Sequence, residues 1–487
     1  MKYKLNFFRK RVFPGRGVLL VNDQSYWVFL TFEEYKKFML GSIDNELFDK
    51  LEKNFMVITE DNEDKLVEAQ KKLYWHIGSG TSLHIINVTS RCNMNCDYCY
   101  ANRVAPTLKN FDMTKETAEK VVNFIFQSPA DYLMIEFIGG EPLMNFDIIK
   151  FVVEKALDKA KETGKHVGFS MTTNATNFDE EKAEFFYKIK LAPCFSIDGP
   201  EWLHNKHRVY FGGRRGTYKD VVKWIKYFKE KYPLLPITGI STITRDSLPY
   251  YKEIIDEYVK LDLPRFPIRP TTQVKAAGVN WKNLGYSVDE FITFWENALN
   301  YLLELNEKKG IRIIDTNTMV YAFYILAHQN IGMTDMEVPC GAIYGQMVYN
   351  FNGDIYPCDE SRSYGVFKLG SVYKNSFKDI VSSKKAALLF NAATNLSSIA
   401  DAKPYPFVNY CFVNTYATQG TIVPKLSEDN IYNIHYKMVD RLFERILFEK
   451  GFKERFVDWL SPDMSKKENL VRFGSDLLSL KDSIEEN

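Results

Sequence analysis

Three cysteines lie close together in one polar segment and could hold an inorganic group. Cys92, Cys96 and Cys99 follow the strand-like run Leu83–Val88 with the spacing Cys-x3-Cys-x2-Cys. A structural zinc ion takes four nitrogen or sulfur ligands, and this segment contains no fourth cysteine or histidine. Three thiolates can instead hold a 4Fe-4S cluster and leave one iron free to bind a small molecule. The alternative, buried and unreactive thiols, is disfavoured by the polarity of the segment.

Polar residues end the strand-like runs that follow these cysteines. Gly139 and Gly140 end the second run, where the missing side chains would let the backbone approach a ligand. The carboxylate of Glu141 can accept a hydrogen bond from an ammonium group. The candidates after the third and fourth runs are Asn174, Ser196 and Arg208. Each could by itself belong to a turn or a solvated loop, but their order along the chain favours a binding site.

The elements that position these residues alternate between strand and helix from about residue 83 to residue 310. The strand-like runs are Leu83–Val88, Leu133–Ile138, His166–Thr172, Pro193–Ile197, Ile237–Thr242 and Arg265–Arg269. Between them lie amphipathic helices, such as the one that Thr114 can cap and the one that stops at Gly164. Right-handed crossovers curl six such units into a full or partial barrel whose chemistry collects at the carboxyl ends of the strands.

The regions on either side of this barrel have different patterns. The first 80 residues are rich in aromatic residues and predict a small α+β domain, while the segment after the barrel is rich in loops and the last segment is helical. The resulting division is 1–80, 81–315, 316–425 and 426–487. The fold class we expect is therefore α/β, with a small domain before the barrel and an extension plus helices after it.

The amino-acid composition limits the kinds of partner that we expect the protein to bind. The 487-residue chain has 63 Lys and Arg against 62 Asp and Glu, so its net charge of +1 gives no field to attract nucleic acid or an anionic membrane. It has no apolar run of the roughly 18 residues needed for a membrane span, and its first residues lack a secretory signal. The seven cysteines are odd in number and clustered, which is typical of ligands rather than disulfides. We expect a cytoplasmic protein.

The cysteine spacing, followed by Gly139-Gly140-Glu141-Pro142, resembles the radical S-adenosylmethionine (SAM) superfamily. The resemblance implies a partial (β/α)6 barrel in which Cys92, Cys96 and Cys99 hold a 4Fe-4S cluster whose open iron binds SAM. In that family an electron from the cluster cleaves SAM to methionine and a 5'-deoxyadenosyl radical, which removes hydrogen from a substrate. The SAM contacts implied by position are Tyr98 near the adenine, Gly139, Gly140 and Glu141 at the amino group, Asn174 at the ribose, and Ser196 and Arg208.

A second set of cysteines, Cys340, Cys358 and Cys411, resembles the SPASM extension of peptide-modifying radical SAM enzymes, which binds auxiliary 4Fe-4S clusters. Asn352-Gly353 predicts a β-hairpin that would bring Cys340 and Cys358 together. Asp359 matches the aspartate that sulfatase-maturing relatives use as a base, and it could take a proton released from a substrate. The alternative for Asp359 is a capped turn.

The extension also departs from the family pattern. Ala402 and Tyr405 stand where a complete SPASM extension has the first two cysteines of a Cys-x2-Cys-x5-Cys run, and only Cys411 remains. Two auxiliary clusters are therefore not expected. One cluster on Cys340, Cys358 and Cys411, with an open or non-cysteine fourth ligand, is one interpretation, and three buried thiols are the other.

The resemblance narrows to the His-Xaa-Ser system radical SAM maturases through motifs such as Asp198-Gly199-Pro200 and Tyr416-Ala-Thr-Gln-Gly420. It implies an enzyme that modifies a ribosomally synthesised peptide by cross-linking, epimerisation or oxidation, with a flavodoxin or ferredoxin as electron donor. The first 80 residues would then read a leader peptide or cap the barrel. The rival interpretations are a sulfatase-type protein maturase and a peptide-binding relative that has lost catalysis.

Overall fold

Five parallel strands form the centre of the structure, a computed structural model that describes residues 3–213, 215–394, 404–463, 465–466, 469 and 480–485. They lie in the order β10-β9-β8-β7-β6, and each pair of neighbours is parallel. Their bounds are β6 (Leu83–Thr89), β7 (Tyr132–Gly139), β8 (His166–Thr173), β9 (Ala192–Ser196) and β10 (Thr238–Ile240). The first five predicted strands are confirmed within a few residues at their ends.

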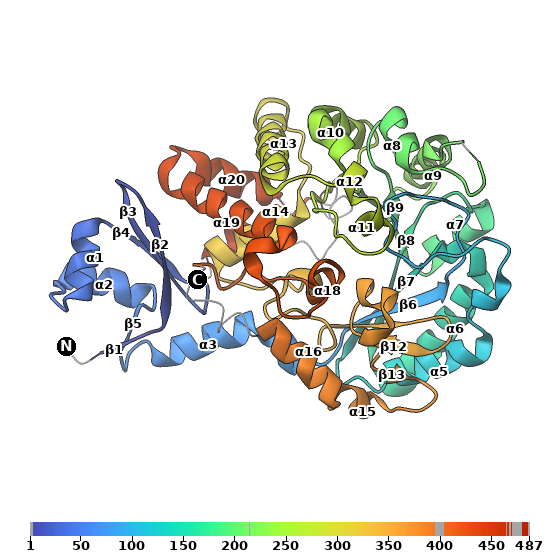
Figure 1. Cartoon of the computed structure of the whole chain (residues 1–487), viewed down its shortest axis with the longest axis horizontal. Helices are drawn as coiled ribbons and strands as arrows, with labels where there is room; N and C mark the ends of the chain where they lie inside the picture. The colour runs from blue at the N-terminus through green and yellow to red at the C-terminus, as the bar shows by residue number, and fades with distance from the viewer. Residues whose placement is uncertain are drawn as a thin grey trace.

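Helices follow the strands and cover the outside of the sheet, as the right-hand side of Figure 1 shows. They are α5 (Lys115–Ile125), α6 (Phe146–Thr163), α7 (Glu180–Lys188), α9 (Tyr218–Lys231) and α10 (Tyr251–Lys260). The Thr114 hydroxyl accepts a hydrogen bond from the Thr117 backbone N–H and caps α5. Gly164 ends α6 with φ of 72°, a left-handed conformation that glycine adopts without steric cost. The expected strand–helix alternation and the α/β fold class are confirmed.

The sixth predicted strand, residues 265–269, does not form a regular strand. Its only pairings are isolated bridges, Arg265 with Ile314 and, just beyond the run, Pro270 with Ile243. The run lies between Pro264 and Pro270 and contains Pro267. Proline has no N–H to donate to a ladder, so a continuous strand cannot form here even though the segment remains extended.

A β-hairpin from the C-terminal extension continues the central sheet on its other side. Its strands are β11 (Gln346–Tyr349) and β12 (Asp354–Tyr356), joined by a turn at Gly353 with φ of 82°, and the short β13 (Gly370–Ser371) follows. The predicted hairpin is therefore confirmed. The sequence did not indicate that β11 would pair in parallel with β6, for example Val348 with Ile85. This pairing makes the extension and the barrel share one eight-stranded sheet.

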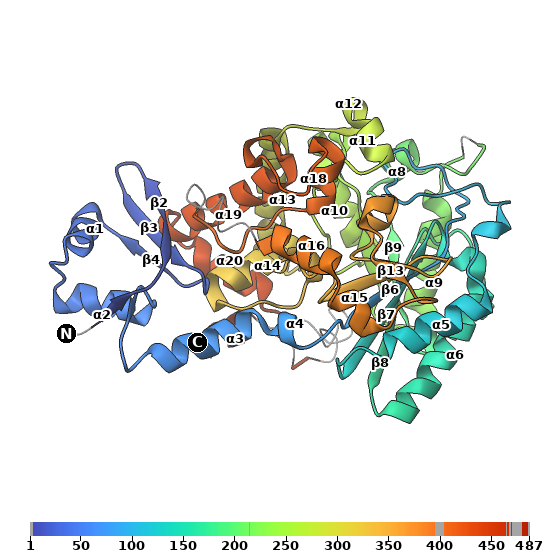
Figure 2. The same ribbon diagram turned by 60° about the horizontal axis from the view of Figure 1, so that its bottom comes forward.

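The N-terminal region forms a smaller antiparallel sheet at one end of the molecule, in blue in Figures 1 and 2. Its elements are β2 (Phe8–Phe13), β3 (Gly17–Asn22), β4 (Trp27–Leu30), α1 (Phe32–Met39) and α2 (Asn45–Lys53). Alternate residues of β3 face opposite ways. Val18 and Leu20 belong to a small core under α1 and α2, whereas Leu19 and Val21 belong to the main core. This region is thus packed against the rest of the chain.

Helices near the C-terminus pack between the small sheet and the barrel. Helix α19 (Asn430–Phe448) contacts α13 (Val288–Lys309) on one side. On the other side, Arg11 of β2 donates two hydrogen bonds to Asp440 of α19, at 2.8 and 3.0 Å. Within the described ranges, no helix combines the length and the apolar character that crossing a bilayer requires.

Candidate active site

One cavity of about 450 Å³ joins both sets of cysteines. Its lining includes the segment that carries Cys92, Cys96 and Cys99, the carboxyl ends of the parallel strands, and parts of the C-terminal extension. The predicted site residues that line it are Tyr98, Gly139, Gly140, Glu141, Asn174, Ser196, Arg208, Cys340, Cys358, Asp359 and Cys411, besides the first three cysteines. Tertiary structure therefore gathers candidates that lie up to about 300 residues apart in sequence.

The three-cysteine segment is anchored at its base by a buried ion pair. Arg91 donates two hydrogen bonds to Asp112, at 2.6 and 2.7 Å, and a third to the Met144 carbonyl. The Cys92 backbone N–H donates to the Val104 carbonyl at 3.1 Å, which closes the segment into a loop. These contacts hold all three thiols on one wall of the cavity before any ligand binds.

Burial keeps these thiols protonated when no cation is near. It raises the pKa of Cys96 to about 12, and it raises the pKa values of Cys92 and Cys99 as well. The neighbouring sulfurs raise the pKa of Cys92 further, because thiolates close together repel one another. A bound metal group reverses this effect, since coordination deprotonates a thiol.

Neither cysteine set is arranged for a single metal ion. Over the part of the chain that the structure describes, no three His, Cys, Asp or Glu side chains could together hold one ion. The ligands of a 4Fe-4S cube stand at separate corners, whereas the ligands of a zinc ion surround one point. Three thiols on one loop with a cavity in front of them fit such a cluster.

Gly139 and Gly140 connect the end of β7 to the cysteine loop. The Gly140 N–H donates to the Thr89 carbonyl and the Glu141 N–H to the Arg91 carbonyl, both at 2.8 Å. A Cβ on Gly140 would lie 2.3 Å from the Arg91 carbonyl oxygen, and one on Gly139 would lie 2.5 Å from that of Thr89. The sequence suggested that these glycines admit a ligand; the structure shows that they also admit the backbone of the cysteine loop.

The carboxylate of Glu141 is buried and held by the end of β8. One oxygen accepts hydrogen bonds from the Thr173 hydroxyl at 2.7 Å and the Leu143 N–H at 3.1 Å, and the other accepts from the Asn174 N–H at 2.8 Å. Burial raises the pKa of Glu141 to about 7, although the hydrogen bonds oppose this. Its position at the cavity wall is therefore fixed by three partners.

Asn174 and Ser196 occupy neighbouring strand ends. The Asn174 amide donates to Asn93 of the cysteine loop at 3.1 Å and lies 3.9 Å from the Cys92 sulfur. Ser196 is the last residue of β9 and is buried at the cavity wall. Asn174 thus contacts the loop that carries the thiols.

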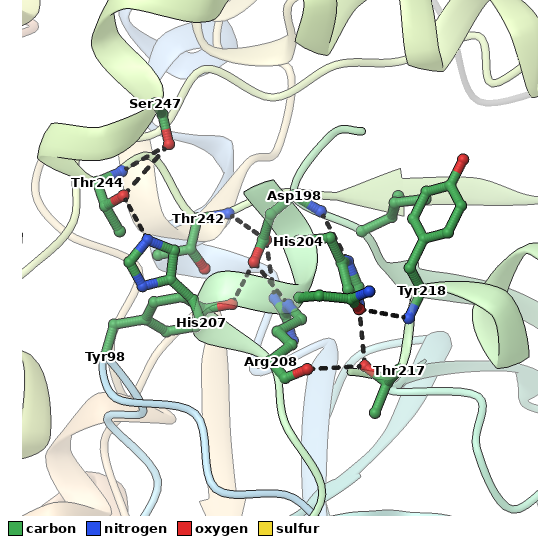
Figure 3. A network of polar contacts seen from close by, with 12 residues as sticks. Tyr98, Asp198, His204, His207, Arg208, Thr217, Tyr218, Thr242, Thr244 and Ser247 are labelled. Carbon is green, nitrogen blue, oxygen red and sulfur yellow. Dashed lines mark hydrogen bonds and ion pairs between the residues drawn. The ribbon is translucent and has the colours of Figure 1, made fainter. Parts of the chain in front are cut away.

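Arg208 and Tyr98 meet at Asp198, which the sequence analysis quoted in a motif but did not select as a site residue (Figure 3). Arg208 donates to both Asp198 oxygens, at 2.8 and 3.1 Å, and the Tyr98 hydroxyl donates to the same carboxylate. The guanidinium carbon lies 5.3 Å from the Tyr98 ring centroid. Arg208 therefore has an internal anion to pair with. A signal was available, because Asp198 lies two residues beyond Ser196 at the end of the same strand.

A second layer holds Asp198 in place. The Thr242 N–H donates to Asp198 at 3.0 Å, and the Asp198 N–H donates to the ring of His204, whose other nitrogen lies 2.9 Å from the Thr217 hydroxyl. Despite burial, the positive charge of Arg208 and the hydrogen bonds from Arg208 and Tyr98 keep the pKa of Asp198 below its usual value. The carboxylate is ionised, and the Arg208 side chain is fixed beside Tyr98.

Asp359 connects the two cysteine regions. Its carboxylate accepts hydrogen bonds from the hydroxyl of Tyr100, next to Cys99, and from Arg362 at 2.7 Å. Arg362 also donates to the Gly139 carbonyl at 3.3 Å. Asp359 is therefore held by a tyrosine and an arginine at the boundary between the barrel and the extension.

The cysteines of the extension come from three separate segments. Cys340 precedes β11, Cys358 follows β12, and Cys411 caps α18 (Phe412–Gln419) by accepting a hydrogen bond from the Asn414 N–H. Burial raises the pKa of each, and the neighbouring thiols raise those of Cys358 and Cys411 further. Of the two residues in place of family cysteines, Ala402 lies outside the described residues, and the Tyr405 hydroxyl donates to Asp440 at 2.5 Å.

Several charged residues of the cavity wall escaped the sequence analysis. Glu136, in the middle of β7, accepts a hydrogen bond from Thr172, and burial raises its pKa to about 7. The others are Arg103, Arg269, Asp335, Glu360 and His435. Only their placement on different strands, loops and helices around one space distinguishes them from ordinary polar residues.

Two protein families match this chain. Residues 86–267 match the radical SAM superfamily, and residues 340–405 match SPASM, an iron-sulfur cluster-binding domain. The barrel segment therefore has the sequence features of the radical SAM superfamily, and the segment after it has those of a SPASM domain. That superfamily uses a 4Fe-4S cluster and SAM, in agreement with the thiols and the cavity described above. The narrower resemblance to the His-Xaa-Ser maturases stays a prediction.

Curated relatives match parts of the chain. The uncharacterized protein MJ0907 of Methanocaldococcus jannaschii is 33% identical to this chain over 171 residues. The matched segment is 35% of this chain, and it spans 56% of the length of MJ0907. The radical SAM cyclopropyl synthase TigE of Paramaledivibacter caminithermalis is 25% identical over 67% of each chain. A cysteine-type anaerobic sulfatase-maturating enzyme of Clostridium novyi is 23% identical over 64% of this chain and 82% of its own.

Solved structures share the fold. The structure of anSMEcpe with bound AdoMet and Cp18Cys peptide superimposes with a TM-score of 0.62 at 19% identity, covering 75% of this chain and 98% of that one. Streptococcus suis SuiB bound to precursor peptide SuiA gives a TM-score of 0.50 at 17% identity, covering 87% and 98%. At these sequence identities, the structural similarity shows a shared fold and nothing about activity.

Proposed function

We propose that this protein is a radical SAM enzyme that modifies a ribosomally synthesised peptide. The observation that carries the proposal is the single cavity lined by the three-cysteine loop, the polar strand ends and the SPASM cysteines. When bound, the 4Fe-4S cluster supplies the electron for reductive cleavage of SAM. Solved structures of the same fold hold peptides, Cp18Cys in anSMEcpe and SuiA in SuiB, which supports a peptide as substrate.

In this proposal the chain's own residues bind and orient SAM. Cys92, Cys96 and Cys99 hold the cluster, and the wall made by Gly140, Glu141 and Asn174 receives the amino acid and ribose parts of SAM. Arg208 lies beside Tyr98, where a planar cation and an aromatic ring can bind the carboxylate and adenine. Because the cavity walls hold these groups rigidly, SAM and substrate would meet in one orientation, which raises their effective concentration.

Asp359 is the candidate base. A carboxylate at the boundary between barrel and extension can accept the proton that a substrate loses when it is oxidised or cross-linked. The hydrogen bonds that it accepts from Tyr100 and Arg362 fix the orientation of this carboxylate. The reducing electron would come from a flavodoxin or ferredoxin.

The experiment that tests catalysis measures 5'-deoxyadenosine. Protein reconstituted with iron and sulfide without oxygen, reduced with dithionite and supplied with SAM is expected to form this product. Cys96→Ala should abolish it, whereas Cys194→Ala should retain it, because Cys194 lies within strand β9 and outside the cavity lining. Absence of the product from the intact protein would favour a peptide binder without catalysis.

The substrate is tested by coexpression. A short peptide encoded beside the gene is expected to change mass in the presence of the intact protein and to remain unchanged with Cys96→Ala. A sulfatase-type maturase is the second candidate, favoured by the relatives named as sulfatase-maturating enzymes. An unchanged peptide together with an oxidised Cys or Ser in a coexpressed sulfatase would support that candidate instead.

A further inference from the structure

The SPASM region holds too few cysteines to complete a cluster. A 4Fe-4S cube has four irons and commonly four thiolate ligands. Of the seven cysteines in the chain, three lie on the barrel loop and Cys194 lies within β9, which leaves Cys340, Cys358 and Cys411. One iron of an auxiliary cluster on these three would need a ligand other than cysteine, or none.

Glu360 lies where that ligand is needed. It comes two residues after Cys358, and one of its carboxylate oxygens lies 3.7 Å from the Cys411 sulfur. The other oxygen accepts a hydrogen bond from the Thr272 hydroxyl at 2.9 Å. Thr272 thus fixes the rotation of the carboxylate so that its other oxygen accepts a hydrogen bond from the Cys411 thiol at the wall of the shared cavity.

The charges around these residues support the same arrangement. Burial raises the pKa of Glu360 to about 7, and Arg269 is the neighbouring cation that opposes this effect. After burial, the charge of Glu360 raises the pKa of each of the three thiols, so four acidic groups lie around one buried space. A buried set of four such groups is costly unless a cationic group neutralises them.

The other acidic side chains nearby either have partners or lie outside the cavity lining. Asp359 is bound by Tyr100 and Arg362. Asp335 is bound by Arg269 and Gln346. Glu337 has a buried oxygen without a hydrogen-bond partner among the described residues, but this residue does not line the cavity.

We propose that Glu360 is the fourth ligand of an auxiliary 4Fe-4S cluster held by Cys340, Cys358 and Cys411. The proposal depends on the SPASM domain binding a cluster, and it does not depend on peptide modification. An oxygen ligand suits iron in these clusters less well than thiolate does, so the iron at Glu360 would differ from the other three.

The test uses the full chain in which Cys92, Cys96 and Cys99 are replaced by alanine, so that only an auxiliary cluster can remain. This parent chain, reconstituted without oxygen, is expected to carry about four irons. Its Mössbauer spectrum should show one iron, about a quarter of the signal, with parameters distinct from the rest. Adding Cys358→Ala to the parent should remove most of the iron.

Substitutions at Glu360 give the decisive comparison. Glu360→Gln in the parent should change the EPR signal of the reduced cluster and the distinct iron signal, and Glu360→Cys should restore four equivalent thiolate-bound irons. Glu444→Gln is the matched control, because Glu444 pairs with Arg441 on α19 outside the cavity lining, and it should leave both spectra unchanged. A parent chain without iron, or Glu360→Gln spectra identical to those of the parent, would overturn the proposal. Neither result would bear on 5'-deoxyadenosine formation by the intact protein, which is a separate measurement.

Discussion

The Arg208 guanidinium shows how single residues of the site depend on partners from other strands. It is bound through both oxygens of Asp198 and lies beside the Tyr98 ring, while Thr242 and His204 fix Asp198 in turn. Arginine presents parallel N–H groups that match a carboxylate, and lysine does not. The fold therefore specifies both the positive charge at position 208 and the orientation of its guanidinium group.

We expect Arg208→Lys to bind SAM about tenfold or more weakly, because a lysine keeps the charge but loses the two-point contact with Asp198. Isothermal titration of the reconstituted protein would measure the affinity. Iron content is the control, and it should not change, since Arg208 is not a cluster ligand. Unchanged SAM affinity would show that Arg208 serves only the internal pair.

At the level of elements, the junction between β6 and β11 joins the barrel to the extension. The junction includes a buried hydrogen bond between the His84 ring and the Tyr349 hydroxyl at 2.8 Å, while the other ring nitrogen faces the Thr81 carbonyl at 3.0 Å. Burial lowers the pKa of His84 to about 3, so the ring is neutral. Both ring nitrogens are thus satisfied within the fold.

Tyr349→Phe should lower the free energy of unfolding by about 1 to 3 kcal/mol, because it leaves a buried ring nitrogen without a partner. Tyr301→Phe is the matched control, since the Tyr301 hydroxyl bonds to Asp256 near the surface, and its cost should stay within about 0.5 kcal/mol. Denaturant unfolding of the two variants checks the difference. Equal costs would mean that the junction tolerates the unpaired nitrogen.

The irregular segment at residues 265–269 depends on Asp315 in place of a strand ladder. This buried carboxylate accepts a hydrogen bond from the Ile268 N–H at 2.8 Å and caps α14 (Thr316–Ala322). Burial raises its pKa from 3.8 to about 6. The folded chain therefore binds this proton more tightly than the unfolded chain does.

The stabilisation from the protonated Asp315 should be fully present below about pH 4 and be lost as the pH rises to about 6. Asp315→Asn stays neutral, so the stability of the wild type relative to this variant should fall by at most about 3 kcal/mol over that range. Unfolding free energies of both proteins at several pH values test this. A relative stability that is constant or rises with pH would contradict it.

At the scale of the whole molecule, the N-terminal region is joined to the rest by an apolar and charged interface. Phe13 packs against Phe448 of α19 with ring centroids 5.2 Å apart, and the Trp27 ring nitrogen donates to the Ile325 carbonyl at 2.6 Å. Together with the Arg11–Asp440 pair, these contacts fix the region relative to the barrel.

Phe13→Ala should destabilise the chain by about 3 to 5 kcal/mol, because it opens a cavity at this interface. Amide hydrogen exchange should then become faster first in β3, because Leu19 and Val21 on one face of this strand pack in the main core. Phe7→Ala is the control, since Phe7 is 57% exposed and its loss should change little. Equal protection of β3 in both variants would show that the small sheet is stable without the interface.

Local patterns in the sequence determined the first five strands, their covering helices, the hairpin at Gly353 and the three-cysteine loop. Each of these depends on residues near one another in the chain, such as the Thr114 cap or the Cys-x3-Cys-x2-Cys spacing. Only the tertiary structure decided the role of Asp198, the parallel pairing of β11 with β6 and the position of Glu360 beside Cys411. These contacts join residues between 10 and about 260 positions apart. No periodicity encodes such contacts, because packing of the whole chain brings the partners together.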